Sequence, residues 1–189
     1  MQMSFREILT IIHGMGCGGL LLLAFSGALI QFYRICTPDR SAPLSIYEQK
    51  LLRIYLIALA VLAWSAVLSG AYVVYPWYRA HPPAGMTDYA EYAQRSLLSS
   101  PTTAGWHNVG MEWKEHVAWF APIAITMVAF VFIKYGSDLS RHRQVRKAAF
   151  AFTVAAFIAA AIAGTFGAML NKKAPVQGGA VIKIMEETK

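Results

Sequence analysis

Four long apolar segments constrain this chain more than any other feature. They run from Ile8 to Tyr33, from Leu51 to Tyr78, from Glu112 to Ile133 and from Ala148 to Leu170. A helix needs about 20 residues to cross a bilayer, and each segment reaches that length. With 57% hydrophobic residues, 14% charged residues and a mean hydropathy of +0.44, the chain is too apolar for an ordinary soluble domain. The sequence therefore predicts an all-α membrane protein, with residues 1–189 forming one bundle of four transmembrane helices.

The arrangement of Lys and Arg predicts how this bundle is oriented. Four spans place both termini and the 79–111 loop on one side, and the 34–50 and 134–147 connections on the other. With Arg53, just beyond the first connection, this second side carries nine basic and three acidic residues, whereas the first side carries eight basic and seven acidic residues. Because basic residues accumulate in short cytoplasmic loops, we expect the termini, the 79–111 loop and the 171–189 tail to lie outside. The net charge of +7 then reflects the membrane topology, so the sequence predicts no nucleic-acid partner. It predicts a protein of the bacterial inner membrane.

Two histidines near the predicted outer face are the best candidates for a functional site. His13 lies six residues beyond Glu7, about 9 Å along a helix and below the outer surface. His116 precedes an apolar run of 17 residues, Val117 to Ile133, which is short for a span and places the helix start before Glu115. Ionisable groups inside membranes are rare and usually functional. We therefore predict that His13 and His116 ligate one metal, with His107 as the alternative second ligand and Met111 as a further one.

Small residues near these histidines suggest where a flat cofactor could lie. Gly14, Gly16, Gly18 and Gly19 follow His13, while Ala156, Ala160, Gly164, Gly167 and Ala168 line one side of the fourth segment. Small residues let helices approach closely in membranes, so helix packing explains both groups equally well or better. Among them, Gly16, Gly164 and Gly167 are the candidate cofactor contacts.

Polar side chains on the second and third segments add to the predicted site. Glu112 and His116 share a helix face at i and i+4, so Glu112 is expected to orient the imidazole or to carry protons. Ser65, Ser69 and Tyr72 share a face of the second segment and could bond across helices. Pro122 lacks the amide proton that would bond to Ala118, which predicts a kink there. Near the C-terminus, residues 181–185 are expected to lie at the surface or to pair with another subunit.

The topology and the two histidines resemble the small four-helix b-type cytochromes that serve as quinone-linked membrane anchors of respiratory complexes. The resemblance covers the helical region only. It implies one haem b near the outer face, because no second histidine pair occurs at the cytoplasmic end. The absence of a Cys-x-x-Cys-His motif makes that haem non-covalent.

Two functional hypotheses follow from these features. In the first, the protein is a membrane subunit that carries one haem b and transfers electrons between a quinol pool and an outward-facing redox partner, with a quinone as a second candidate ligand. In the second, it is a cofactor-free structural subunit of a larger membrane complex. A transporter is less well supported, since the sequence has no repeat and no pair of broken helices.

Overall fold

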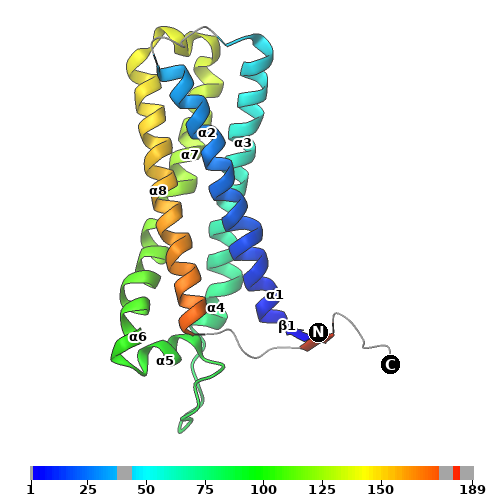
Figure 1. Cartoon of the computed structure of the whole chain (residues 1–189), viewed down its shortest axis with the longest axis vertical. Coiled ribbons are helices and arrows are strands. Elements are labelled where there is room, and N and C mark those ends of the chain that lie inside the picture. Colours follow the sequence, from blue (N-terminus) through cyan, green and yellow to red (C-terminus); the bar gives the residue numbers. More distant parts are fainter. Residues whose placement is uncertain (1, 38–43, 175–180, 184–189) are drawn as a thin grey trace.

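Four long helical spans run side by side in a computed structural model of the chain (Figure 1). The structure describes residues 2–37, 44–174 and 181–183, and it is 84% helical. The spans are Phe5–Cys36, Ile46–Tyr78, Pro101–Tyr135 and Arg143–Lys173. Each is long and apolar enough to cross a membrane, which confirms the predicted helical bundle and the class of multi-pass membrane protein.

Each span consists of one or more helical segments. The first contains α1 (Phe5–Ile11), η1 (Ile12–Gly19) and α2 (Leu20–Cys36), and the second contains α3 (Ile46–Ser69), η3 (Gly70–Val74) and α4 (Tyr75–Tyr78). The third contains α6 (Pro101–Gly105), η4 (Trp106–Met111), η5 (Trp113–Val117) and α7 (Phe120–Tyr135). A 3-10 turn, η6 (Gly136–Arg141), leads into α8 (Arg143–Lys173), which is one uninterrupted helix.

Local capping residues explain where two of the spans begin. The Ser4 hydroxyl accepts a hydrogen bond from the Glu7 amide at 3.2 Å, while the Glu7 carboxylate accepts one from the Ser4 amide at 2.6 Å. Ser45 and Glu48 form the same reciprocal capping box before α3. These caps satisfy amides that a helix start leaves unpaired, and they extend the helices beyond the apolar limits predicted at Ile8 and Leu51.

The third span begins eleven residues earlier than predicted, at Pro101 instead of Glu112. Ser100 caps it by accepting a hydrogen bond from the Thr102 amide at 3.3 Å, and proline at the first helical position supports the start. The predicted 79–111 loop is therefore too long, because hydropathy does not detect a helix whose first turns are polar. Within this loop the structure forms one short helix before the third span, α5 (Ala93–Leu98).

The third span is also interrupted where proline predicted a kink. The α-helical pattern gives way to a turn at Ala118 and Trp119, one turn before Pro122. The amide of Ala121 bonds to the Ala118 carbonyl at 3.2 Å, in place of the bond that proline cannot donate. This break separates α7 from the irregular segments that carry His107 and His116.

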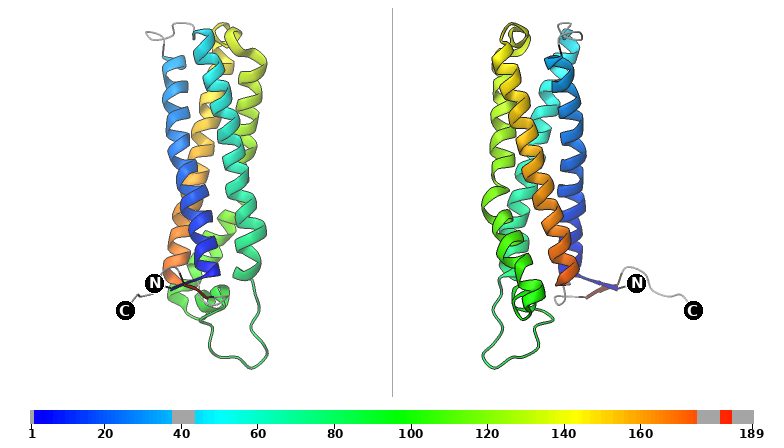
Figure 2. Two further views of the ribbon diagram at one scale, coloured as in Figure 1. Left: turned by 90° about the vertical axis from the view of Figure 1, so that its right-hand side faces the viewer. Right: turned by 60° about the vertical axis from the view of Figure 1, so that its left-hand side comes forward.

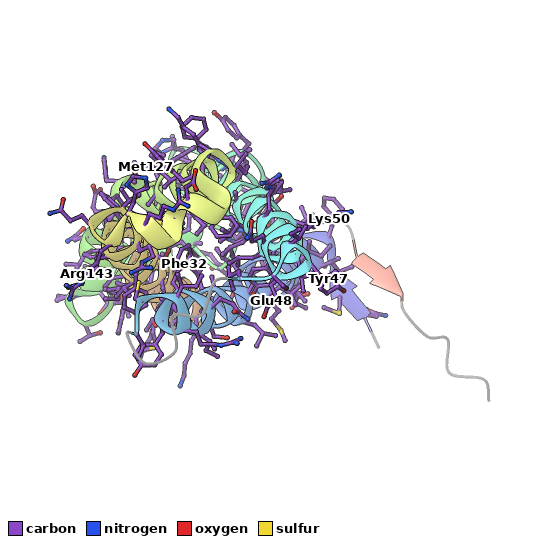
Figure 3. The ribbon with its side chains drawn as sticks, turned by 90° about the horizontal axis from the view of Figure 1, so that it is seen from above. Phe32, Tyr47, Glu48, Lys50, Met127 and Arg143 are labelled. Atoms are coloured by element: carbon purple, nitrogen blue, oxygen red, sulfur yellow. The ribbon has the colours of Figure 1, made fainter. Side chains whose placement is uncertain are left out.

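The apolar core lies in the half of the bundle away from the termini. Phe25 and Phe32 of α2, Leu56 of α3 and Ile125 and Phe132 of α7 are almost completely buried there. Viewed from above, Phe32 lies between the helices, whereas Tyr47 and Arg143 project outward (Figure 3). Large apolar side chains such as Met15, Leu23 and Phe130 are more than 60% exposed, as expected for helices whose outer faces contact a lipid bilayer.

The two ends of the described chain meet at the opposite end of the bundle. Strand β1 (Gln2–Ser4), which leads directly into α1, pairs antiparallel with β2 (Val181–Lys183) (Figures 1 and 2). Residues 181–185 were expected to lie at the surface or to pair with another subunit, and their described part pairs with the protein's own N-terminal segment. At the same end, a small cluster of Tyr78, Leu97, Met111 and Leu170 joins α4, α5, η4 and α8.

Candidate cofactor site

Irregular helical segments with i to i+5 hydrogen bonding gather in the terminal half of the bundle. They are η1, η3, η4 and η5, in three different spans of the described chain (Figure 1). Such π-type segments are rare, and they frequently occur at functional sites. The same half holds His13, His107 and His116, so the candidate site lies in this part of the bundle.

The imidazole of His13 bonds across to the second span. Its Nδ1 lies 2.9 Å from Oγ of Ser69, and the same Oγ lies 3.1 Å from the carbonyl oxygen of Ala66. A serine hydroxyl has one proton and the carbonyl can only accept, so both bonds form together only if Nδ1 carries the imidazole proton. The lone pair of the neutral ring is then on Nε2, the nitrogen available to a metal. Ser69 therefore bonds across helices, as its position on the predicted polar face suggested.

A glycine makes room for this ring. A β-carbon at Gly70, the first residue of η3, would lie 2.9 Å from Cε1 of His13 and 3.3 Å from its Nε2. Any side chain at residue 70 would therefore displace the imidazole. Gly70 was not among the residues predicted from the sequence, because its role depends on the rotation of one helix against another.

Lys114 directs its ammonium group into the same half of the bundle. A β-carbon at Gly167 of α8 would lie 2.7 Å from Lys114 Nζ, so the predicted cofactor glycine Gly167 accommodates a lysine here. Lys114 is also within electrostatic range of His13. In the described part of the chain, Lys114 forms no hydrogen bond or ion pair.

His116 lies on a different face of the third span from Lys114. Two helical positions separate the side chains by about 200°, and the His116 side chain is 70% exposed. Its Nδ1 lies 3.0 Å from the carbonyl oxygen of Glu112, which can only accept, so Nδ1 is protonated and Nε2 again carries the lone pair. The structure thus gives His13 and His116 separate hydrogen-bond partners, and their ligation of one metal stays a prediction.

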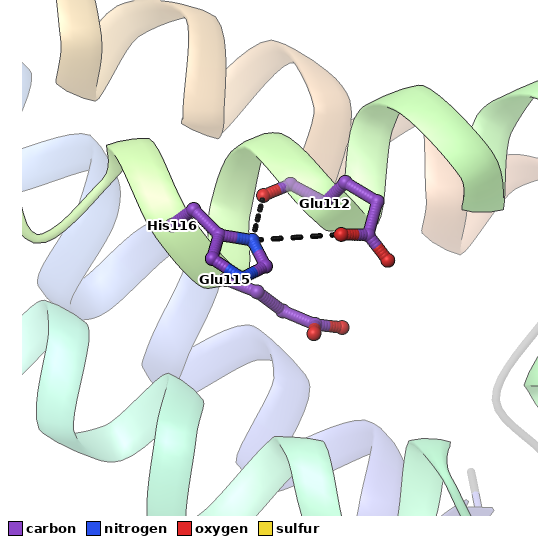
Figure 4. Close-up of side chains that lie close together, drawn as sticks. All are labelled: Glu112, Glu115 and His116. Carbon is purple, nitrogen blue, oxygen red and sulfur yellow. Dashed lines mark hydrogen bonds and ion pairs between the residues drawn. The ribbon is translucent and has the colours of Figure 1, made fainter.

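Glu112, Glu115 and His116 form a cluster on the third span, with Glu112 and His116 exposed and Glu115 half-buried (Figure 4). The Glu112 carboxylate lies 3.5 Å from Nδ1 of His116, as their i and i+4 spacing allows, and the predicted role of Glu112 at a cofactor site stays a prediction. One ligand atom from each of the three residues lies within 4.8 Å of the others, close enough to hold a metal ion. Oxygen and imidazole ligands together suit several divalent cations.

Glu115 connects this cluster to the end of the second span. Its Oε2 lies 3.5 Å from Nη2 of Arg79, whereas Oε1 is buried without a hydrogen-bond partner among the described residues. Arg79 also donates from Nε to the Tyr75 hydroxyl at 2.7 Å. This hydrogen bond, with the nearby Glu115 carboxylate, raises the pKa of the Arg79 guanidinium. Arg79 is therefore the counter-ion of Glu115.

His107, the predicted alternative ligand, is buried in a different network. Its Nδ1 lies 2.9 Å from the Tyr78 hydroxyl, and its Nε2 lies 3.3 Å from the Gln94 side-chain amide. Both ring nitrogens are thus engaged by other elements, α4 and α5. This arrangement ties the outer segments to the bundle, and it leaves neither nitrogen free for a metal without breaking a bond.

The remaining predicted glycines lie in ordinary surroundings. A β-carbon at Gly16 would have no neighbour within 4 Å, and the residue is exposed. Gly164 faces the first span, where a β-carbon would lie 3.6 Å from Cδ1 of Leu22. Gly164 thus serves helix packing in this structure, and a cofactor contact at either glycine stays a prediction.

Comparison with family models, curated proteins and solved structures found no match for this chain.

Proposed function

We propose that this protein is an integral membrane subunit that binds one haem b through His13 and transfers electrons between a quinol pool and a partner redox protein. The proposal depends on which nitrogen of the His13 ring holds the proton. Ser69 holds Nδ1 as the protonated nitrogen, which leaves the Nε2 lone pair available inside a bundle of apolar helices. Metal-ligating histidines are commonly held in this way, with the second ring nitrogen donating a hydrogen bond that sets the tautomer and the ring orientation.

Small residues and irregular backbone surround His13. Gly70 keeps side-chain atoms away from Nε2, and Gly167 leaves space for the Lys114 ammonium. The nearby π-type segments mark backbone that departs from regular packing. The position of the His13 ring against Ser69 and the π-type segments around it support a ligand site at Nε2.

His116 is the proposed second ligand, and His107 is the competitor. Among the described residues, the Nε2 lone pair of His116 has no partner and its side chain is exposed, whereas both nitrogens of His107 are bonded. His116 must turn about the helix axis to reach the His13 side of the bundle. When a π-type turn, with i to i+5 hydrogen bonds, becomes an α-helical turn, with i to i+4 hydrogen bonds, that turn contains one residue fewer. The helix beyond it then rotates by about 100°. The segments η4 and η5 are therefore where this rotation would occur.

When bound, haem would supply reversible one-electron chemistry. The chain would supply the rest: His13 as ligand, Ser69 to hold its ring, and apolar helices to exclude water. Glu112, whose carboxylate is exposed, would accept protons from a quinol beside the third span. The predicted placement of the terminal half at the outer face of a bacterial inner membrane brings this site to a periplasmic partner.

The test is a reduced-minus-oxidised spectrum of the purified protein after loading with haem. We expect one b-type spectrum, its loss in His13→Ala, and a change from low spin to high spin in His116→Ala. His142→Ala is the matched control, because His142 packs on Tyr135 at the far end of the bundle. A protein that takes up no haem would support the cofactor-free structural subunit instead. An unchanged spectrum in His116→Ala, with loss of low spin in His107→Ala, would assign the second ligand to His107.

A further inference from the structure

Glu112, Glu115 and His116 stand at i, i+3 and i+4 along the third span, so their side chains share one face of the helix (Figure 4). One ligand atom of each residue lies within 4.8 Å of those of the other two. A metal ion such as Zn²⁺ holds oxygen and nitrogen ligands at about 2.0–2.2 Å, so two of its ligands are at most about 4 Å apart. The three side chains therefore need to close by less than about 1 Å to share one ion.

A buried oxygen atom of Glu115 gives an independent reason to place a ligand here. Oε1 of Glu115 has almost no accessible surface and no hydrogen-bond partner among the described residues. Arg79 pairs with the other oxygen, Oε2, at 3.5 Å. A buried acceptor without a partner is unfavourable, and a cation bound between Glu112, Glu115 and His116 would supply that partner. Arg79 would then orient Glu115, as hydrogen-bonding residues commonly do for carboxylates that ligate a metal.

We propose that Glu112, Glu115 and His116 bind one divalent transition-metal ion, for which Zn²⁺ is the best fit. Two carboxylates match the charge of a divalent cation, and an imidazole among the ligands favours a transition metal over Mg²⁺ or Ca²⁺. Nδ1 of His116 lies 3.0 Å from the Glu112 carbonyl oxygen. Such a bond commonly orients a metal-ligating histidine and leaves Nε2 free for the ion. With three protein ligands, a water molecule would complete the four-coordinate shell that Zn²⁺ prefers.

This metal site goes beyond the proposed function, because it needs no haem. The side chains of Glu112 and His116 are 51% and 70% exposed, so an ion can enter from outside the bundle. The ion would use His116 in the position that the structure gives it, whereas ligation of haem by His116 requires the third span to turn. The two uses of His116 exclude each other, and a bound ion would hold the third span in its present rotation.

The experiment is a calorimetric titration of the full-length protein in detergent, without a histidine tag and without added haem, with ZnCl₂ and with MgCl₂. We expect one Zn²⁺ per chain and no binding of Mg²⁺ at the same concentration. Glu112→Gln, Glu115→Gln and His116→Ala should each weaken Zn²⁺ binding by about tenfold or more, since even the loss of a residue that supports a metal ligand commonly has this effect. Glu112 and His116 are exposed, so their variants keep the packing of the bundle even if Glu115→Gln, which loses its pair with Arg79, does not.

His81→Ala and Glu91→Gln are the matched controls, because both residues are exposed in the segment between α4 and α5 at the same end of the bundle. Both variants should bind Zn²⁺ as the wild-type protein does. Wild-type protein that binds no Zn²⁺ would overturn the inference, and so would equal affinity for Zn²⁺ and Mg²⁺, which would exclude the imidazole as a ligand. Equal weakening in His81→Ala and His116→Ala would also overturn it, as binding spread over the surface. Each of these outcomes leaves haem binding at His13, and with it the proposed function, intact.

Discussion

The Nδ1 atom of His13 and the Oγ atom of Ser69 lie 2.9 Å apart, although 56 residues separate them in the chain. This hydrogen bond joins the first two membrane spans within their apolar region. Because Ser69 also donates to Ala66, it determines which nitrogen of the imidazole is protonated. The bond therefore links the packing of two helices to the chemistry available at His13.

Removing the Ser69 hydroxyl should weaken the site. Ser69→Ala leaves Nδ1 of His13 without its acceptor, so we expect about a tenfold or larger loss of haem affinity, as for other partners that hold metal-ligating histidines. The loss of the hydrogen bond should also lower the free energy of unfolding by about 1 kcal/mol. Haem titration and thermal unfolding measure the two effects. Ser65→Ala is the control, because Ser65 is exposed and bonds only to the Val61 carbonyl of its own helix.

Adding a methyl group at Gly70 should displace the His13 ring. A β-carbon there would be 2.9 Å from Cε1, and such overpacking typically costs about 1–3 kcal/mol. We expect Gly70→Ala to lower thermal stability and to shift the spectrum of bound haem. Gly16→Ala, at an exposed helical position with no neighbour within 4 Å, should be neutral or stabilising. A large loss of haem binding in Gly16→Ala would instead favour the sequence-based prediction of a cofactor contact at Gly16.

The network around His107 should prove structural. Tyr78→Phe removes the hydroxyl that bonds to His107 Nδ1 and should reduce the free energy of unfolding by about 1–3 kcal/mol, because it leaves a buried polar atom unpaired. Chemical denaturation in detergent measures this change. The spectrum of bound haem should stay the same, as it should in the exposed variant Tyr72→Phe. A spectral change confined to Tyr78→Phe would count against a structural role and in favour of His107 as a ligand.

The orientation of the bundle can be tested by cysteine labelling in whole bacterial cells. In a background with Cys17 and Cys36 replaced by serine, Ser99→Cys lies at an exposed position near the terminal end, and Asp138→Cys lies at an exposed position at the other end. A membrane-impermeant thiol reagent should modify residue 99 in intact cells and residue 138 only after lysis. The reverse pattern would place the termini in the cytoplasm and would contradict the prediction made from the basic residues.

Much of the fold was predictable because a bilayer acts on local composition. The four spans were found from apolar runs, although their ends were placed too far inside the helices where capping residues such as Ser4 and Ser45 extend them. The start of the third span was missed because residues 101–111 are too polar to be recognised as part of a span from hydropathy. Their helical state depends on the cap at Ser100 and on packing against α5 and α8.

The candidate site was less predictable, and Lys114 shows why. In the sequence, Lys114 stands between Glu112 and Glu115, and nothing local distinguishes it from these interfacial charges. The structure directs Lys114 toward Gly167 inside the bundle and leaves His116 on the exposed face. The separation of these two neighbours depends on how the third helix is rotated about its axis.

The sequence by itself determined the number of membrane spans, the pairing of Glu112 with His116 and the candidacy of His13, because each depends on composition or on spacing within one helix. Only the tertiary structure decided that His13 bonds to Ser69, that Gly70 and Gly167 make room for a ring and an ammonium, and that His107 is enclosed by Tyr78 and Gln94. These contacts depend on the rotation and depth of one helix against another. In three spans, irregular hydrogen bonding at η1, η3, η4 and η5 changes that rotation, and no local pattern in the chain specifies it.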